Sequence, residues 1–111
     1  MSGMLVYCMS KSALDQMTAC TALELASKGV RVNSVNPGVT VTQIYRGSGE
    51  TEEQYAASLE RQKKEIQPMR RVGDADEVAQ ATAFLASSSS ASFITGEHLH
   101  VDGGWHAACL Q

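Results

Sequence analysis

The sequence lacks any cluster of lysine and arginine longer than the pairs Lys63-Lys64 and Arg70-Arg71, and its formal net charge is −3. This pattern argues against a nucleic-acid partner, because proteins that bind nucleic acid concentrate basic residues on one face. The sequence also lacks an apolar run of the roughly 20 residues that a membrane-spanning helix needs. Residues 1–6 have neither the basic flank nor the apolar length of a signal peptide. We therefore expect a cytoplasmic protein whose partners include no membrane and no nucleic acid.

Metal-binding and disulfide-forming patterns are also missing. Cys8, Cys20 and Cys109 lie far apart, and their odd number argues against a disulfide framework. We expect all three to be reduced and mostly packed. His98 and His100 alternate along an expected strand and therefore share one side of it, where zinc could bridge them. No third ligand stands at a fixed spacing from them, so we expect no metal site.

What is present is the composition of a globular protein. Hydrophobic residues make up 43% of the chain and charged residues 19%, as is typical of one soluble domain. No internal repeat or domain boundary interrupts residues 1–111. We expect these residues to form a single domain.

The chain shows a succession of helical and strand patterns. No glycine or proline occurs over 7–28, which predicts a helix that Gly29 ends. Branched residues over 30–35 predict a strand, which Asn36-Pro37-Gly38 stops with turn chemistry. Further elements are expected over 51–66 (helix), from residue 74 to the serine run 87–90 (helix) and over 97–101 (strand). Two strands separated by helical crossovers favour parallel neighbours in an α/β sheet.

The helix over 7–28 has apolar or small residues on two faces. One stripe consists of Met9, Ala13, Met17, Cys20 and Leu23, and the other of Tyr7, Lys11, Leu14, Thr18 and Leu25. A helix of this kind must be covered on both faces.

The segments after the first strand carry weaker signals. Strand propensity alone predicts that residues 39–42 return as a hairpin strand. Thr51 and Gln54 form a capping box for the helix over 51–66, whose charges predict surface ion pairs at i,i+4. Those expected pairs are Glu60 with Lys64 and Arg61 with Glu65.

Tyr7 and Lys11 lie four residues apart, on one helical face and about one turn from each other. An ammonium group close to a phenol stabilises the phenolate, so that the hydroxyl can exchange a proton with a substrate alcohol or carbonyl. The spacing alone is weak evidence, because a packed tyrosine beside a lysine occurs on many helices.

The order of the surrounding motifs makes the pair informative. From Tyr7 to Gly104 the chain resembles the short-chain dehydrogenase/reductase family. The matching pieces are Tyr7-x-x-x-Lys11, Arg31-Val32-Asn33, Asn36-Pro37-Gly38 with Thr42, Arg71-x-Gly73, Glu77-Val78-Ala79, Phe84-Leu85, Thr95-Gly96 and Val101-Asp102-Gly103-Gly104. The resemblance implies the carboxy-terminal part of a Rossmann-like NAD(P)-binding fold, which is a doubly wound parallel α/β sheet and is truncated here.

The resemblance also implies an activity, which is hydride transfer between a nicotinamide cofactor, NAD or NADP, and a small-molecule carbonyl or alcohol. Tyr7 would be the acid/base residue, and Lys11 would bind the nicotinamide ribose. Both would contact the cofactor, together with a loop beside the nicotinamide formed by Pro37, Gly38, Thr40 and Thr42. This loop contradicts the hairpin that propensity predicts. The helix over 51–66 would be the substrate lid, with a hinge at Ser48-Gly49.

Several family features have no match. The serine that polarises the carbonyl stands about thirteen residues before the tyrosine in this family, and Ser2 is too close to replace it. The glycine-rich turn for the pyrophosphate has no match either, so only the nicotinamide half of the cofactor site is expected. Arg70 stands where the family usually has glycine, and Ala75 where proline is common.

Two interpretations of the chain remain open. One is an incomplete fragment of an oxidoreductase whose full-length form is a homo-oligomer. The alternative is a non-catalytic short isoform that associates with itself or with a full-length relative through the helix over 7–28.

Overall fold

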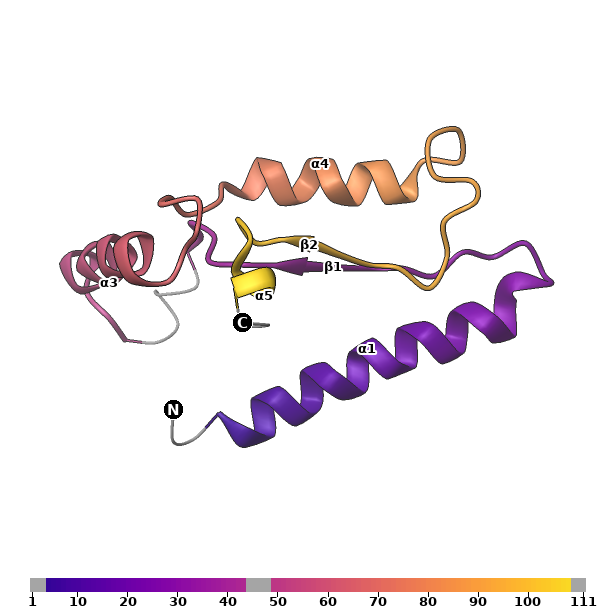
Figure 1. Ribbon diagram of the computed structural model, residues 1–111, viewed down its shortest axis with the longest axis horizontal. Coiled ribbons are helices and arrows are strands. Elements are labelled where there is room, and N and C mark those ends of the chain that lie inside the picture. Colours follow the sequence, from indigo (N-terminus) through magenta and orange to yellow (C-terminus); the bar gives the residue numbers. More distant parts are fainter. Residues whose placement is uncertain (1–3, 44–48, 109–111) are drawn as a thin grey trace. The chain divides into compact units, whose positions relative to one another are not determined.

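The computed structural model describes residues 4–43 and 49–108 (Figure 1). The expectations for Ser2, Ser48 and Cys109 fall outside these residues. The elements are α1 (Leu5–Ala26), β1 (Ser34–Pro37), α3 (Glu52–Glu65), α4 (Ala75–Ala86), β2 (His98–Val101) and α5 (Trp105–Ala108). The predicted order of helix, strand, helix, helix and strand is confirmed, and the short helix α5 was not predicted. Within the described ranges, no helix is long and apolar enough to cross a membrane.

The end of α1 follows from one glycine. Gly29 has a φ of +72°, which is the left-handed conformation that glycine adopts without steric cost. The Gly29 and Lys28 amides donate to the last carbonyls of the helix, those of Ala26 and Leu25. The predicted helix end is thus confirmed to within two residues.

The first strand begins later than predicted and includes Asn36 and Pro37. The prediction of a strand over 30–35 is therefore wrong in both bounds. The reason is the partner strand, because residues before Ser34 face a loop rather than β2. There the Val32 amide donates to the Thr95 hydroxyl, and the Val32 carbonyl accepts from the Gly96 amide.

β1 and β2 form a two-stranded sheet, and both strands run in the same direction. The Ser34 amide donates to the Glu97 carbonyl and the Gly38 amide to the Val101 carbonyl, as in parallel strands. The expected parallel α/β arrangement is confirmed. Residues 39–42 form no hairpin strand, and Thr40 instead makes one parallel bridge with Gly73. The hairpin prediction is therefore wrong, and these residues form a loop.

The chain divides into two compact units, residues 1–34 with 83–99 and residues 35–82 with 100–111. In the first unit, Thr18 and Ala22 of α1 are buried. Met9, Met17 and Leu23 are 62%, 57% and 82% exposed, so their stripe is uncovered within this unit, and the expected cover on both faces of α1 stays a prediction. The expectation that the cysteines are packed is wrong for those that are described, because Cys8 and Cys20 are exposed.

In the second unit the predicted capping box of α3 is complete. The Gln54 amide donates to the Thr51 hydroxyl, and the Thr51 amide donates to the Gln54 side chain. The surface ion pair of Glu60 forms with Lys63 at i,i+3 rather than with Lys64, and its hydrogen bond lowers the pKa of Glu60. The start of this helix is therefore set by its own sequence.

Arg70 follows α3 with a φ of +57°, a conformation that favours glycine. Its guanidinium donates to the Lys64 carbonyl at 2.9 Å, near the end of α3. This bond satisfies a helix carbonyl that has no partner within the helix. The arginine thus offsets part of the backbone strain that the usual glycine would avoid.

Candidate functional site

Tyr7 and Lys11 lie together on the exposed side of α1, as their spacing predicts. The Lys11 ammonium nitrogen is 5.4 Å from the centre of the Tyr7 ring, within the range of a cation–π contact. Tyr7 is 56% exposed, which leaves it accessible to a ligand. The Ser10 hydroxyl donates to the Tyr7 carbonyl at 2.7 Å. The two side chains are therefore close neighbours on one face of the helix, as i,i+4 spacing allows.

The loop after β1 is held on both sides by backbone hydrogen bonds. At its start the Gly38 amide donates to the Val101 carbonyl at 3.0 Å, and the Thr40 hydroxyl donates to the Gly38 carbonyl at 3.1 Å. Further along, the Val41 amide donates to the Gly73 carbonyl and the Gly73 amide to the Val39 carbonyl, both at 2.9 Å. The backbone of residues 38–41 is thus fixed by contacts with two separate segments.

Gly38 is required by the close approach of Asp102, the residue that directly follows β2. A Cβ at this position would lie 2.6 Å from the Asp102 Cα and 2.8 Å from the Asp102 Cβ. No side chain fits at such distances without moving the backbone.

The four loop residues that the resemblance assigns to the nicotinamide line one hollow. Its volume is about 350 Å³, and its lining is Pro37, Gly38, Thr40, Thr42, Ala75 and Val78. This volume lies at the lower end of the range for ligand pockets. Ala75 and Val78, in the first turn of α4, form an apolar wall.

Ala75 and Val78 were not predicted as site residues. They reach the hollow because the bridge between Thr40 and Gly73 brings the start of α4 to the loop. Thr40 and Gly73 are far apart in the sequence, and nothing in the sequence pattern marks their pairing.

Helix α3 contacts the loop through one side chain. The hydroxyl oxygen of Tyr55, which is half-buried, accepts a hydrogen bond from the Thr42 amide at 3.1 Å. The predicted lid helix and the predicted cofactor loop are therefore joined in the same unit of the chain.

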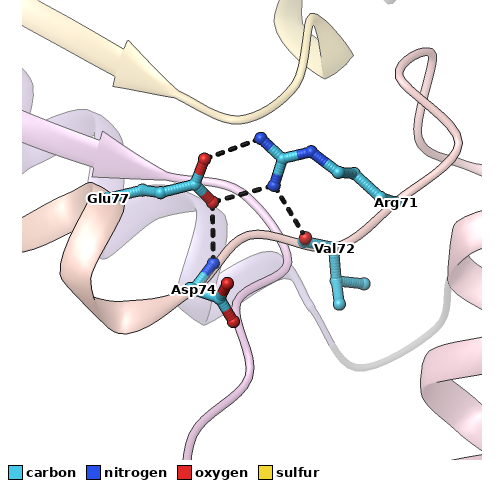
Figure 2. Close-up of polar contacts among 4 residues, drawn as sticks. All are labelled: Arg71, Val72, Asp74 and Glu77. Carbon is cyan, nitrogen blue, oxygen red and sulfur yellow. Dashed lines mark hydrogen bonds and ion pairs between the residues drawn. The ribbon is translucent and has the colours of Figure 1, made fainter.

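Arg71 and Glu77 fix the segment that carries Gly73 (Figure 2). The guanidinium binds both carboxylate oxygens, at 2.8 and 2.6 Å, and also donates to the Val72 carbonyl. The Asp74 amide donates to Glu77 at 2.9 Å. The hydrogen bonds from Arg71 and then from the Asp74 backbone lower the pKa of Glu77 to about 2, and the same pairing raises the pKa of Arg71. The Glu77 carboxylate thus accepts a hydrogen bond from the amide of the residue that precedes α4.

Three histidines are partnered within their own units. His98 Nδ1 lies 2.7 Å from the Ser34 hydroxyl, and the His100 ring stacks on the His106 ring at 4.1 Å. His106 also binds the buried carboxylate of Asp102 at 2.9 Å. Burial disfavours the charged form of Asp102, but hydrogen bonds from the His106 and Gly104 amides and the His106 ring hold its pKa below the usual value. No group of three metal-ligating side chains occurs among residues 4–43 and 49–108.

The structure thus brings the predicted residues together in two groups. Tyr7 and Lys11 belong to the first unit, and Pro37, Gly38, Thr40 and Thr42 belong to the second. Within each group the side chains are neighbours, and their roles at a cofactor stay a prediction.

Comparisons with known proteins agree with this description. The family model described as enoyl-(acyl carrier protein) reductase matches residues 1–106. L-xylulose reductase from Caenorhabditis elegans is 44% identical over 100 residues, which are 90% of this chain and 38% of that protein.

Two solved structures have the same fold. A short-chain dehydrogenase/reductase of unknown function from Caenorhabditis elegans, with cofactor, superposes with a TM-score of 0.86 at 33% identity, over 93% of this chain and 39% of that one. A small-chain dehydrogenase in complex with NADPH superposes with a TM-score of 0.71 at 33% identity, over 84% and 39%. The chain spans under two-fifths of the length of these relatives. All three are named as dehydrogenases or reductases, so they lend no support to a non-catalytic isoform.

Proposed function

The chain belongs to the short-chain dehydrogenase/reductase family, and from this membership we propose that it holds the acid/base pair and the nicotinamide loop of an NAD(P)-dependent oxidoreductase. The observation that carries the proposal is the single hollow lined by Pro37, Gly38, Thr40 and Thr42. The proposal concerns the share of the catalytic machinery that these 111 residues contain.

In the proposed reaction Tyr7 gives its hydroxyl proton to the carbonyl oxygen of the substrate. A bound reduced nicotinamide supplies the hydride. The ammonium of Lys11, which lies over the Tyr7 ring, stabilises the phenolate that remains after the proton has left. Lys11 would also hold the nicotinamide ribose by donating hydrogen bonds to it. In the opposite direction Tyr7 accepts the proton of the substrate alcohol.

The loop residues suit the nicotinamide end of the cofactor for chemical reasons. Pro37 and Gly38 present backbone without bulky side chains, which permits close approach of a planar ring. The hydroxyls of Thr40 and Thr42 offer polar contacts for the carboxamide and neighbouring oxygens. Ala75 and Val78 give the hollow an apolar wall against which a ring can pack. The residues present therefore fit the nicotinamide half of NAD or NADP.

We propose a small-molecule substrate with a carbonyl or alcohol group. L-xylulose reductase, whose name specifies a sugar ketone, is one relative with this chemistry. We also propose that the protein self-associates, because the exposed apolar stripe of α1 includes Met9, Met17 and Leu23.

A chimaera tests the catalytic proposal. Residues 7–104 would replace the aligned segment of the Caenorhabditis elegans L-xylulose reductase, and reduction of L-xylulose by NADH and NADPH would be followed. We expect turnover, and we expect Tyr7→Phe to lower kcat by roughly 10²- to 10⁴-fold. Lys11→Met should also lower it, whereas Lys28→Met, the same change near the other end of this helical segment, should not. A folded chimaera that is inactive, or that is unaffected by Tyr7→Phe, would contradict the proposal.

A further inference from the structure

Tyr55 occupies a defined place in the first turn of α3. The capping box of Thr51 and Gln54 fixes this turn, and the Tyr55 amide donates to the Thr51 carbonyl at 3.0 Å. The backbone that carries the Tyr55 ring is therefore held by hydrogen bonds. Its hydroxyl oxygen can keep a hydrogen-bond donor in place. That partner is the backbone amide of Thr42.

The position of Thr42 gives this hydrogen bond its importance. The backbone bonds to the neighbouring segments hold the loop from Gly38 to Val41. Thr42 comes directly after them and still lines the hollow. Its amide is tied to α3 rather than to the sheet or to the segment before α4.

We propose that Tyr55 is a positioning residue that couples α3 to the loop of residues 37–42 by holding the Thr42 backbone in the arrangement that lines the hollow. The coupling rests on the hydrogen bond itself, and its consequence for a nicotinamide ligand rests on the proposed function. Because linkage is reciprocal, a ligand that orders Thr42 also stabilises the start of α3, and a movement of α3 changes the affinity for that ligand.

A purely apolar role for Tyr55 predicts different behaviour. The sequence places Tyr55 in an apolar stripe with Leu59 and Ile66, and phenylalanine would serve that stripe equally well. The positioning role requires the hydroxyl oxygen. Tyr55→Phe therefore separates the two roles, because it keeps the ring and removes the hydroxyl that accepts from the Thr42 amide.

Amide hydrogen exchange of the intact 111-residue chain tests the coupling. We expect Tyr55→Phe to speed exchange of the Thr42 amide by roughly 3- to 10-fold, as for the loss of one ordinary hydrogen bond. The amides of Val41 and Gly73, which bond elsewhere, should change less than about twofold, and the helix content should not change. Thr51→Ala serves as a comparison that loosens the helix start while leaving the hydroxyl. Unchanged exchange at Thr42 in Tyr55→Phe would overturn the proposal.

Titration with reduced nicotinamide mononucleotide, followed by NMR, tests the consequence for the ligand. Its dissociation constant should rise by roughly 3- to 10-fold in Tyr55→Phe. Equal binding by both proteins would overturn the positioning role. An absence of binding to both would count against the proposed function, and exchange at Thr42 would then decide the coupling by itself.

Discussion

Gly38→Ala would place a methyl group where the backbone of Asp102 already lies. The new Cβ would be 2.6 Å from the Asp102 Cα and 3.1 Å from the Asp102 carbonyl oxygen. Carbon atoms in contact normally lie about 3.5 to 4.0 Å apart, so the two segments must separate by about 1 Å. The hydrogen bond from the Gly38 amide to Val101, at 3.0 Å, lies in the same place and would lengthen.

The expected cost combines two effects. Forcing a methyl group into a packed contact costs about 1 to 3 kcal/mol, and weakening one backbone hydrogen bond costs about 0.5 to 1.5 kcal/mol. We expect Gly38→Ala to lower the free energy of unfolding by about 2 to 4 kcal/mol. Gly73→Ala is the matched control, because its Cβ would meet its nearest neighbours at 3.6 and 3.7 Å, which are ordinary contacts. It should change the free energy by less than about 0.5 kcal/mol.

Urea unfolding monitored by circular dichroism measures the free energy of unfolding of both variants. If this free energy falls equally steeply with urea concentration in both, the two variants expose the same surface on unfolding. The hollow should respond as well, because Gly38 lines it. We expect NMR shifts at Thr40 in Gly38→Ala to exceed those in Gly73→Ala. If the two variants unfold at the same urea concentration, the close approach of Gly38 to Asp102 does not limit the size of the residue at position 38.

Three further predictions concern other elements. Thr51→Ala should destabilise the protein by about 1 kcal/mol and lower its helix content by circular dichroism, because it removes the capping hydroxyl of α3; an unchanged helix content would contradict this. Because the pKa of Glu77 is lowered to about 2 from 4.5, its pairing with Arg71 stabilises the protein above pH 4.5, and this contribution should be lost as the pH falls toward 2. The urea concentration at the unfolding midpoint should therefore fall between pH 4.5 and 2. In Glu77→Gln this fall should be smaller, because the titrating carboxylate is gone. Leu23→Glu should weaken self-association in sedimentation velocity runs, because Leu23 is 82% exposed on α1, whereas Lys28→Glu should have little effect.

The parts of the fold that local sequence determines were predictable. Gly29 ends α1 because its own backbone conformation requires it, and the capping box starts α3 because both partners lie within four residues. The bounds of β1 were missed because a strand begins where its partner begins, and this depends on β2. Strand propensity over residues 39–42 was overridden by the bridge between Thr40 and Gly73.

The candidate site was predictable to a similar degree. Helical spacing together with the ordered motifs predicts Tyr7 and Lys11, and the family resemblance predicts the loop residues. Ala75 and Val78 were missed because they reach the hollow through a contact between distant segments. The bond between Tyr55 and Thr42 was missed for a different reason: helical periodicity treats Tyr55 as an apolar residue and says nothing about its hydroxyl.

The central claim is that the loop of residues 37–42 binds the nicotinamide end of a cofactor. The most direct test compares two halves of the cofactor by NMR, titrating the chain with reduced nicotinamide mononucleotide and separately with adenosine diphosphate. We predict that the mononucleotide shifts the amide signals of Gly38, Thr40 and Thr42, with a dissociation constant on the order of 1 mM because few contacts are made. Adenosine diphosphate should leave these signals in place. Shifts of the same residues with adenosine diphosphate, or no shifts with the mononucleotide, would contradict the claim.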